Sequence, residues 1–252
     1  MNLIPVRGFV LNSFSFAEAD KIVQLYTLEL GRVKAIAKGA RKLKSKLSSA
    51  IDLFTESGFS LHKKPSADLY LLSQAKVIRG YSELKKDFRT ITALQVLADL
   101  LIQTLHDTEP HPEIYSLLRE TLSVLGEKPG NGELFLSAFA LKFLELLGHP
   151  IELENCAECG ASLGRKKAFL IPHRGGALCE SCCPSGPARL KVGPAGLEVL
   201  KKIRSLPMEK VHVLKLKAGF TRGIFLTVLE YSERTIERKL KTVEYYLKVL
   251  PE

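Results

Sequence analysis

Two pairs of cysteines in the second half of the chain set the tightest limit on its local fold. Cys156 and Cys159 form the first pair, Cys179 and Cys182 form the second, and two residues separate the cysteines within each pair. This spacing is typical of a zinc site in which two tight turns direct four thiolates at one ion, about 2.3 Å from each sulfur. Because four thiolates leave no open coordination position, we predict one structural Zn²⁺ ion rather than a catalytic one.

Two glycine-containing segments favour such a site. Gly160 directly follows Cys159 and lets the backbone fold back, so that amide N–H groups can reach the sulfurs. Between the two pairs, the sequence RGG at residues 174–176 offers the turn of a short hairpin. We therefore expect a small zinc-binding module over residues 151–187.

The alternatives to zinc are disulfide bonds and a metal site that has lost its metal. The apolar stretch at the N-terminus is interrupted by Arg7 and Asn12, and no small-residue cleavage site follows, so it does not resemble a signal peptide. The chain contains no run of about 18 apolar residues, so we predict no membrane span. We expect a cytoplasmic protein with reduced thiols, which disfavours disulfides. Cys183 is expected to be a bystander thiol.

The first 80 residues have the pattern of short strands. Apolar runs rich in Val, Ile and aromatic residues are separated by turn signals such as Leu30-Gly31 and Lys64-Pro65-Ser66. Five such runs predict a small β-barrel of the OB type. In the third run we expect Val33, Ala35 and Ala37 to face the barrel interior.

Helical spacing of apolar residues begins after Gly80. Residues 133–147 are apolar on most sides, which predicts a central helix. Residues 233–248 are expected to form the last helix, with Ser232 as its N-cap and the stripe Ile236, Leu240, Val243 and Leu247 on one face. The fold class is thus α+β and multidomain. We predict four parts: an OB-fold at 1–80, helices at 81–150, the zinc-binding module at 151–187 and further helices at 188–252.

The net charge of +10 indicates an acidic partner, most often nucleic acid or an anionic membrane. Basic residues are in excess at both ends of the chain, and acidic residues are in excess over residues 81–150. A run without Asp or Glu covers residues 31–47, and more cations lie near the C-terminus. A solvated surface is the alternative for such runs. The predicted DNA-binding residues are Arg32, Lys34, Lys38, Arg41, Lys42, Lys44, Lys46, Arg238, Lys239 and Lys241.

Aromatic residues on the predicted strands could stack against bases. The candidates are Phe9, Phe14 and Tyr26, although burial in the core is the interpretation that we favour. No P-loop, paired metal-binding histidines or nucleophile–base arrangement can be recognised, so we do not expect an enzyme. The alternative in that class is a zinc-dependent nuclease.

Four blocks of the sequence resemble one bacterial family. They are GFVLNSFSFAEADKIVQLYTLELGRVKAIAKGARKLKSKL at 8–47, FALKFLELLGHPIELENCAECG at 139–160, GGALCESC at 175–182 and RKLKTVEYYL at 238–247. Together they are similar to the RecO recombination mediators along nearly the whole chain. Thr242 stands where we expect Ser, and Asp52-Leu53-Phe54 stands where the family often has a proline. Several members lack the cysteines, whereas this chain keeps four in register.

The resemblance implies an N-terminal OB-fold, a helical domain and an embedded zinc-binding module. It implies binding of single- and double-stranded DNA, annealing of complementary strands, and action with RecR to load RecA onto DNA coated by single-strand binding protein during repair. It also implies binding of the acidic C-terminal tail of single-strand binding protein, a location at the bacterial nucleoid, and no bond-breaking chemistry. The rival hypothesis is a protein–protein adaptor of a repair complex that contacts DNA only incidentally.

Overall fold

The structure is a computed structural model of the 252-residue chain. It describes residues 3–63, 67–127, 131–164, 166–183 and 190–250. The chain forms two compact units. The first unit comprises Met1–Lys86 and Ala98–Ser116, and the second comprises Asp87–Leu97 and Leu117–Glu252. The predicted four-part division into domains stays a prediction.

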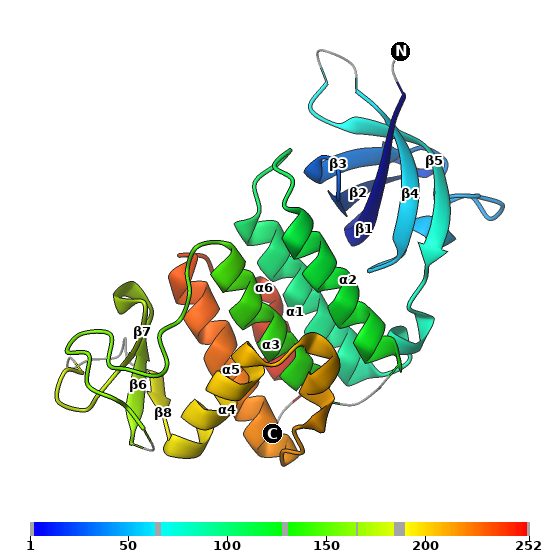
Figure 1. The fold of residues 1–252 in the computed structure, drawn as a ribbon. Helices are drawn as coiled ribbons and strands as arrows, with labels where there is room; N and C mark the ends of the chain where they lie inside the picture. Colours follow the sequence, from blue (N-terminus) through cyan, green and yellow to red (C-terminus); the bar gives the residue numbers. More distant parts are fainter. Residues whose placement is uncertain (1–2, 64–66, 128–130, 165, 184–189, 251–252) are drawn as a thin grey trace. The chain divides into compact units, whose positions relative to one another are not determined.

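Five strands form a closed barrel in the first unit, in the order β1-β2-β3-β5-β4. The strands β3 and β5 pair in parallel, whereas the other neighbours are antiparallel (Figure 1). The OB-type barrel and the mixed α+β class predicted from the sequence are therefore confirmed. The strands are β1 (Leu3–Phe16), β2 (Asp20–Thr27), β3 (Gly31–Ala37), β4 (Glu56–His62) and β5 (Tyr70–Arg79).

Side chains of a strand alternate between its two faces, and this alternation determines which residues lie inside the barrel. In β3, Val33, Ala35 and Ala37 are buried as predicted, while the residues between them are only partly buried. The small alanines leave room for larger side chains from the other strands, among them Leu25 and Phe59. At these positions the core of the barrel is therefore filled by apolar side chains.

The connection from β3 to β4 is the longest between consecutive strands that the structure describes completely. It contains the short 3-10 helix η1 (Ser49–Ile51) and projects from the barrel in Figure 1. Ile51 joins the barrel core, so the connection is held to the barrel at its far end. Most of the predicted basic run lies in the preceding part of this connection.

The second segment of the first unit packs against the barrel wall. It contains the last part of α1 (Phe88–Thr104), the loop after it and the start of α2 (Pro112–Glu127). The Tyr26 hydroxyl donates to the carbonyl oxygen of His111 at 2.9 Å, and the rings of Phe9 and Tyr115 lie 5.0 Å apart. These contacts bury two aromatic residues of the barrel on the side that faces this segment.

In the second unit, α3 (Gly132–Leu146) is buried on nearly all sides, as predicted for the helix at 133–147. Figure 1 shows α4 (Pro194–Ser205) and α5 (Ala218–Thr235) beside it, and the 3-10 helix η4 (Met208–Val213) also contacts it. None of the helices in the described part of the chain is long and apolar enough to cross a membrane.

The prediction of one helix over residues 233–248 is wrong. The helix α5 ends at Thr235, and α6 (Lys241–Val249) begins only after a break in which Glu237 adopts a left-handed backbone conformation. The carboxylate of Glu233 accepts a hydrogen bond from the Leu240 amide at 2.7 Å, which stabilises the turn. Ser232 is no N-cap, because it lies inside α5 and donates to the Val228 carbonyl at 2.7 Å.

A three-stranded sheet accompanies the cysteines, with the strand order β7-β6-β8. The strands β6 (Ala168–Ile171) and β7 (Gly176–Leu178) form the predicted hairpin, and β8 (Leu190–Val192) pairs with the other edge of β6. Gly175 has φ of 74° in the turn, where its N–H donates to Pro172 at 2.9 Å. The predicted turn at 174–176 is therefore confirmed.

Candidate functional site

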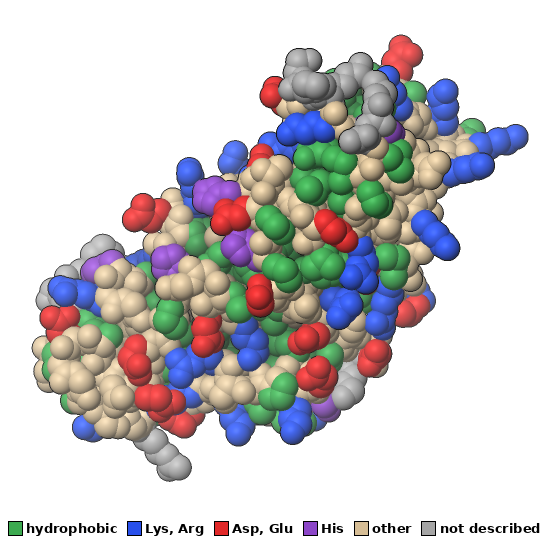
Figure 2. Space-filling view, turned by 45° about the horizontal axis from the view of Figure 1, so that its top comes forward, with side chains coloured by type: hydrophobic (Ala, Val, Ile, Leu, Met, Phe, Trp, Pro, Cys, Tyr) green, Lys and Arg blue, Asp and Glu red, His purple; other side chains and the backbone are tan. Residues whose placement is uncertain are grey.

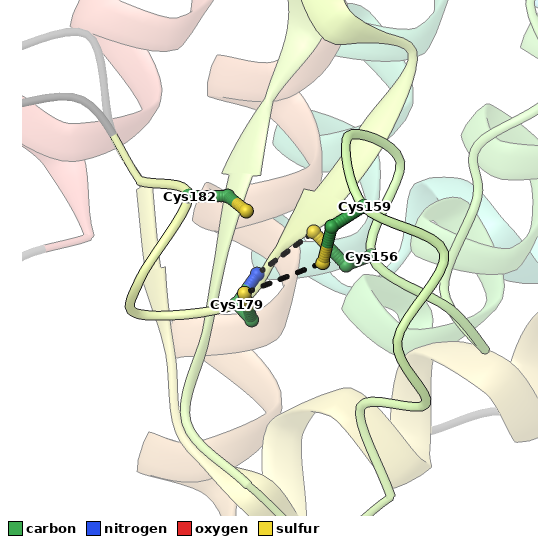
Figure 3. A group of neighbouring side chains, drawn as sticks. All are labelled: Cys156, Cys159, Cys179 and Cys182. Carbon is green, nitrogen blue, oxygen red and sulfur yellow. Dashed lines mark hydrogen bonds between the residues drawn. The ribbon is translucent and has the colours of Figure 1, made fainter.

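The four paired cysteines converge on one point. Their Sγ atoms all lie within 4.8 Å of one another, and those of Cys159 and Cys179 are 3.9 Å apart (Figure 3). A tetrahedral zinc ion with Zn–S bonds of about 2.3 Å would separate its sulfurs by about 3.8 Å. The four thiols therefore fit a zinc ion in number, type and spacing, and Cys183 is not a member of the group.

Local hydrogen bonds build the turn that carries the first pair. Gly160 has φ of 72°, and its N–H donates to the Cys156 carbonyl at 2.8 Å. The Cys156 amide donates to Ala161 at 2.8 Å, so the chain reverses directly after the pair. The Ala157 amide donates to Ala177 of β7 at 2.9 Å, which places the first pair beside the strand that leads to Cys179.

The electrostatic surroundings of the thiols differ. Burial acts to raise the pKa of Cys156, but hydrogen bonds from the backbone N–H groups of Cys159 and Cys179 outweigh it and lower the pKa to about 6. Hydrogen bonding with the Cys159 and Cys179 thiols raises the pKa of Cys182 to about 12. A set of close thiols that share protons in this way is a good ligand set for a divalent cation, which displaces the protons.

Charged side chains support the module without entering the cluster. Glu152 accepts hydrogen bonds from the amides of Glu154 and Asn155 at 2.7 and 2.8 Å, and the Asn155 bond is the main reason that its pKa is lowered. Glu154 pairs with Lys201 of α4 at 3.1 Å. These two carboxylates therefore stabilise the segment of chain that leads to Cys156.

The predicted DNA-binding residues of the first unit fall into two groups. Arg32 is largely buried: its guanidinium donates to Asp107 at 2.7 Å and to the Ile102 carbonyl. Lys34 is partly buried on the outer face of β3. The remaining five are exposed along the β3–β4 connection: Lys38, Arg41, Lys42, Lys44 and Lys46. Figure 2 shows blue Lys and Arg side chains on the segment that projects from the barrel at the right of the view.

The basic connection has an ordered start. The Gly39 amide donates to the Asp20 carboxylate at 2.8 Å, and the Arg41 amide donates to the Ala19 carbonyl at 2.9 Å. Ala19 lies in the hairpin turn between β1 and β2, and Asp20 is the first residue of β2. The exposed cations therefore project from a turn that is tied to a neighbouring part of the barrel.

An apolar row crosses the outer face of the barrel next to these cations. Strand pairing places Phe14 opposite Ile22, Ile22 opposite Ile36, and Ile36 opposite Leu71. Phe14 is 45% exposed, whereas the other two stacking candidates, Phe9 and Tyr26, are buried as favoured from the sequence. This row could not be recognised from the sequence, because the partners of Phe14 depend on strand register. The alternation in β2 is the signal that could have revealed Ile22.

A polar pocket of about 580 Å³ opens beside Lys34 in the same unit. The described residues that line it include Lys34, Lys63, Tyr70, Asp68 and Asp107. Lys63 lies over the Tyr70 ring, with Nζ 5.0 Å from the ring centroid. Lys63 was not among the predicted residues, since two neighbouring lysines at the end of a predicted strand give no signal of a binding site in the sequence.

The C-terminal cations Arg238, Lys239 and Lys241 are exposed in the second unit. The first two lie in the break between α5 and α6, and Lys241 is the first residue of α6. Lys239 pairs with Glu233 at 3.2 Å, while 84% of its side chain stays exposed. Their role in DNA binding stays a prediction.

Two family models match the chain in succession. The model described as Recombination protein O N terminal matches residues 1–81, and the one described as Recombination protein O C terminal matches residues 85–244. The chain is 31% identical to the DNA repair protein RecO of Desulforamulus reducens, over 97% of this chain and 94% of that one. It is 30% identical to the protein of that name from Symbiobacterium thermophilum, over 97% of each chain.

Proposed function

Because the chain belongs to the RecO family of recombination proteins, we propose that it is a DNA-binding recombination mediator in DNA repair and not an enzyme. The observation that carries this proposal is the group of exposed cations on the β3–β4 connection, beside an outer barrel face with an exposed aromatic residue. In this proposal the protein acts by binding DNA strands, and no covalent bond is made or broken.

The outer face of the barrel supports binding of a single strand. Phe14 offers a ring on which a base can stack, and Ile22 and Ile36 continue the apolar surface across two strands. Lys34 and Lys38 flank this surface and can follow the phosphates. This is the face of strands 2 and 3 that OB-folds use for oligonucleotides in general.

Contacts to phosphates alone also suit annealing of complementary strands. Exposed lysines neutralise the backbone without reading the bases, so the choice of partner is left to base pairing. Arg238, Lys239 and Lys241 are proposed as a second cationic group for the same purpose. Double-stranded DNA, the product of annealing, is bound through the same backbone charges.

We further propose that the chain acts with RecR and binds the acidic C-terminal tail of single-strand binding protein, so that RecA is loaded on coated DNA. Cytoplasmic location at the nucleoid follows from such partners. The alternative, an adaptor with only incidental DNA contact, requires that partner binding survive when DNA binding is abolished.

One structural Zn²⁺ ion is proposed at Cys156, Cys159, Cys179 and Cys182. The ion would join the turn after residue 155 to the end of β7 and leave no position for substrate. Metal analysis of protein purified under reducing conditions should find one zinc per chain. Protein that is folded and free of metal would contradict this proposal.

The DNA-binding proposal is tested by the dependence of affinity on salt. If about five phosphates of a single strand are neutralised, log K should fall against log salt with a slope near −3.5. The double substitution Lys42→Glu and Lys44→Glu should weaken binding to all sequences alike and make the slope shallower. Lys202→Glu with Lys210→Glu is the matched control, because both lysines are exposed in the second unit and the net charge changes equally.

Two outcomes would contradict the proposal. Equal affinity of the Lys42/Lys44 variant and the wild type would make the basic connection a solvated surface. Shortened DNA after incubation of the wild type with Zn²⁺ or Mg²⁺ would instead favour the nuclease. The functional readout is annealing of complementary oligonucleotides coated by single-strand binding protein at two salt concentrations.

A further inference from the structure

The side chain of Leu43 is unusually exposed. Its relative accessibility is 106%, whereas the other large exposed apolar residues of the described chain lie between 38% and 55%. Single exposed leucines are common on protein surfaces and require no explanation by themselves. Leu43 differs because no residue of the described chain covers its side chain, and because of the residues on either side.

Cations surround Leu43 along the chain. Lys42 and Lys44 are its direct neighbours, Arg41 and Lys46 lie within three residues, and all four are exposed. No Asp or Glu occurs between Glu29 and Asp52. An apolar side chain in this setting would meet a polyanion that also offers an apolar interior, and the stacked bases of DNA fit both requirements.

The turn that carries Leu43 is hydrogen-bonded on both sides of it. The Lys42 amide donates to Gly39 at 3.1 Å, and the Ser45 amide donates to Lys42 at 2.9 Å. The guanidinium of Arg41 donates to the Ala17 carbonyl at 3.1 Å and so ties the turn to the β1–β2 hairpin. The leucine is therefore presented to solvent by a defined turn.

We propose that Leu43 is a wedge that inserts between neighbouring base pairs of duplex DNA while Lys42 and Lys44 hold the flanking phosphates. Apolar side chains inserted at a base step partly unstack it and bend the duplex. This inference rests on the proposed DNA-binding function and adds a contact to the bases. A protein that loosens stacking where it holds the backbone facilitates both the separation and the pairing of strands.

The chain contains no tryptophan, which makes a direct test available. Leu43→Trp introduces a single indole, whose emission should be strongly quenched on saturation with duplex DNA because it stacks on bases. Val213→Trp is the matched control, since Val213 is 54% exposed in the second unit and should show little quenching. Binding is followed independently by the anisotropy of labelled duplex.

A second variant tests the wedge without a bulky probe. Leu43→Ala should abolish the rise in fluorescence of 2-aminopurine that wild type causes in duplex DNA, and should weaken duplex binding about three- to tenfold by loss of apolar burial. The salt slope should not change, because the lysines remain. Lys42→Glu with Lys44→Glu should instead change the slope.

The outcomes separate the two proposals. If the Leu43→Trp protein binds duplex by anisotropy but its emission does not change, the wedge is wrong while DNA binding stands. The wedge is also wrong if the indole responds to vesicles of anionic lipid and not to duplex. If wild type binds neither single- nor double-stranded DNA, the proposed function itself fails.

Discussion

The barrel and the cysteine module are held together in different ways. The strands of the barrel run for 7 to 14 residues and enclose a continuous apolar core. The strands β6, β7 and β8 have only 3 or 4 residues, and the turns that carry the thiols are partly exposed. The barrel is held by its apolar core, whereas in a module of this size the proposed zinc ion would add a further link between the turns.

The largest expected effect comes from breaking that link. Cys179→Ser removes one thiolate from the centre of the cluster, so zinc should be lost and residues 151–183 should unfold locally. Zinc contributes about 10–16 kcal/mol to the folding of isolated zinc-finger peptides, and even part of this exceeds the stability of a small sheet. Hydrogen exchange should show loss of amide protection in the module and unchanged protection in β1 to β5.

Cys183→Ser is the control for this variant. Cys183 follows the cluster directly but is not part of it, so zinc content and amide protection should match the wild type. Loss of protection in the barrel after Cys179→Ser would contradict the difference between the two regions. Full zinc content in the same variant would show that three thiolates suffice.

The two regions also differ in how far the sequence predicts them. The cysteine spacing is local, so residues 156–182 carry enough information to predict both the cluster and its hairpin turn. The barrel was predicted from alternation, which places Val33, Ala35 and Ala37 inside but does not determine which strands are neighbours. The pairing of β3 with β5 and the row through Phe14 and Ile36 depend on register, which only the folded chain fixes.

Side-chain contacts between distant segments explain the remaining errors. The sequence does not distinguish Arg32 from the other cations of the basic run, yet an ion pair with Asp107 holds its side chain in a largely buried position. The last helix was predicted from an apolar stripe that continues through residues 236–240. In the structure α5 ends at Thr235, and the Leu240 amide donates to the Glu233 carboxylate instead of continuing a helical hydrogen-bond pattern.

The second largest effect is expected in the barrel core. Leu61 is fully buried in the core cluster, so Leu61→Ala should lower the free energy of unfolding by about 3 kcal/mol through lost burial and a cavity. Denaturant unfolding of the metal-loaded protein measures this. Leu43→Ala is the matched control and should change stability by less than about 0.5 kcal/mol, because Leu43 is exposed. Equal effects of the two variants would show that the barrel is not held by its core.

A smaller effect should follow from the buried pair of Tyr115 and Glu56. The Tyr115 hydroxyl donates to the Glu56 carboxylate at 2.9 Å, and Tyr115→Phe should cost about 2 kcal/mol because a buried carboxylate loses a donor. Burial, followed by the charge of Glu56, raises the pKa of Tyr115 above its usual value of 10. Its contribution is therefore complete below pH 10 and is lost as the pH rises further.

The alkaline limb of the stability curve checks this prediction. Wild type should lose stability above pH 10 more steeply than Tyr115→Phe, with tyrosinate absorbance rising as the protein unfolds. Tyr245→Phe is a suitable control, because Tyr245 is 50% exposed. Identical slopes for the wild type and the Tyr115 variant would mean that this hydroxyl does not ionise on unfolding.

The smallest effect is expected at the start of α1, and it acts at acid rather than alkaline pH. Asp87 accepts hydrogen bonds from the hydroxyl and the amide of Thr90 at 2.5 and 2.9 Å, and the hydroxyl is the main reason that its pKa is lowered. Asp87→Ala should cost about 1 kcal/mol at neutral pH, as for other N-caps. A lowered pKa means that the contribution is present above about pH 4 and is lost as the pH falls below it.

Asp87→Asn distinguishes the charge from the cap. Asparagine can still accept the Thr90 amide, so this variant should keep most of the stability at pH 7 but lose the acid dependence. Hydrogen exchange of the first turn of α1 at pH 7 and pH 3 provides the measurement. If the alanine and asparagine variants open this turn equally at pH 7, the ionised carboxylate rather than its geometry holds the helix start. The charge–dipole attraction would then be the dominant interaction at this helix end.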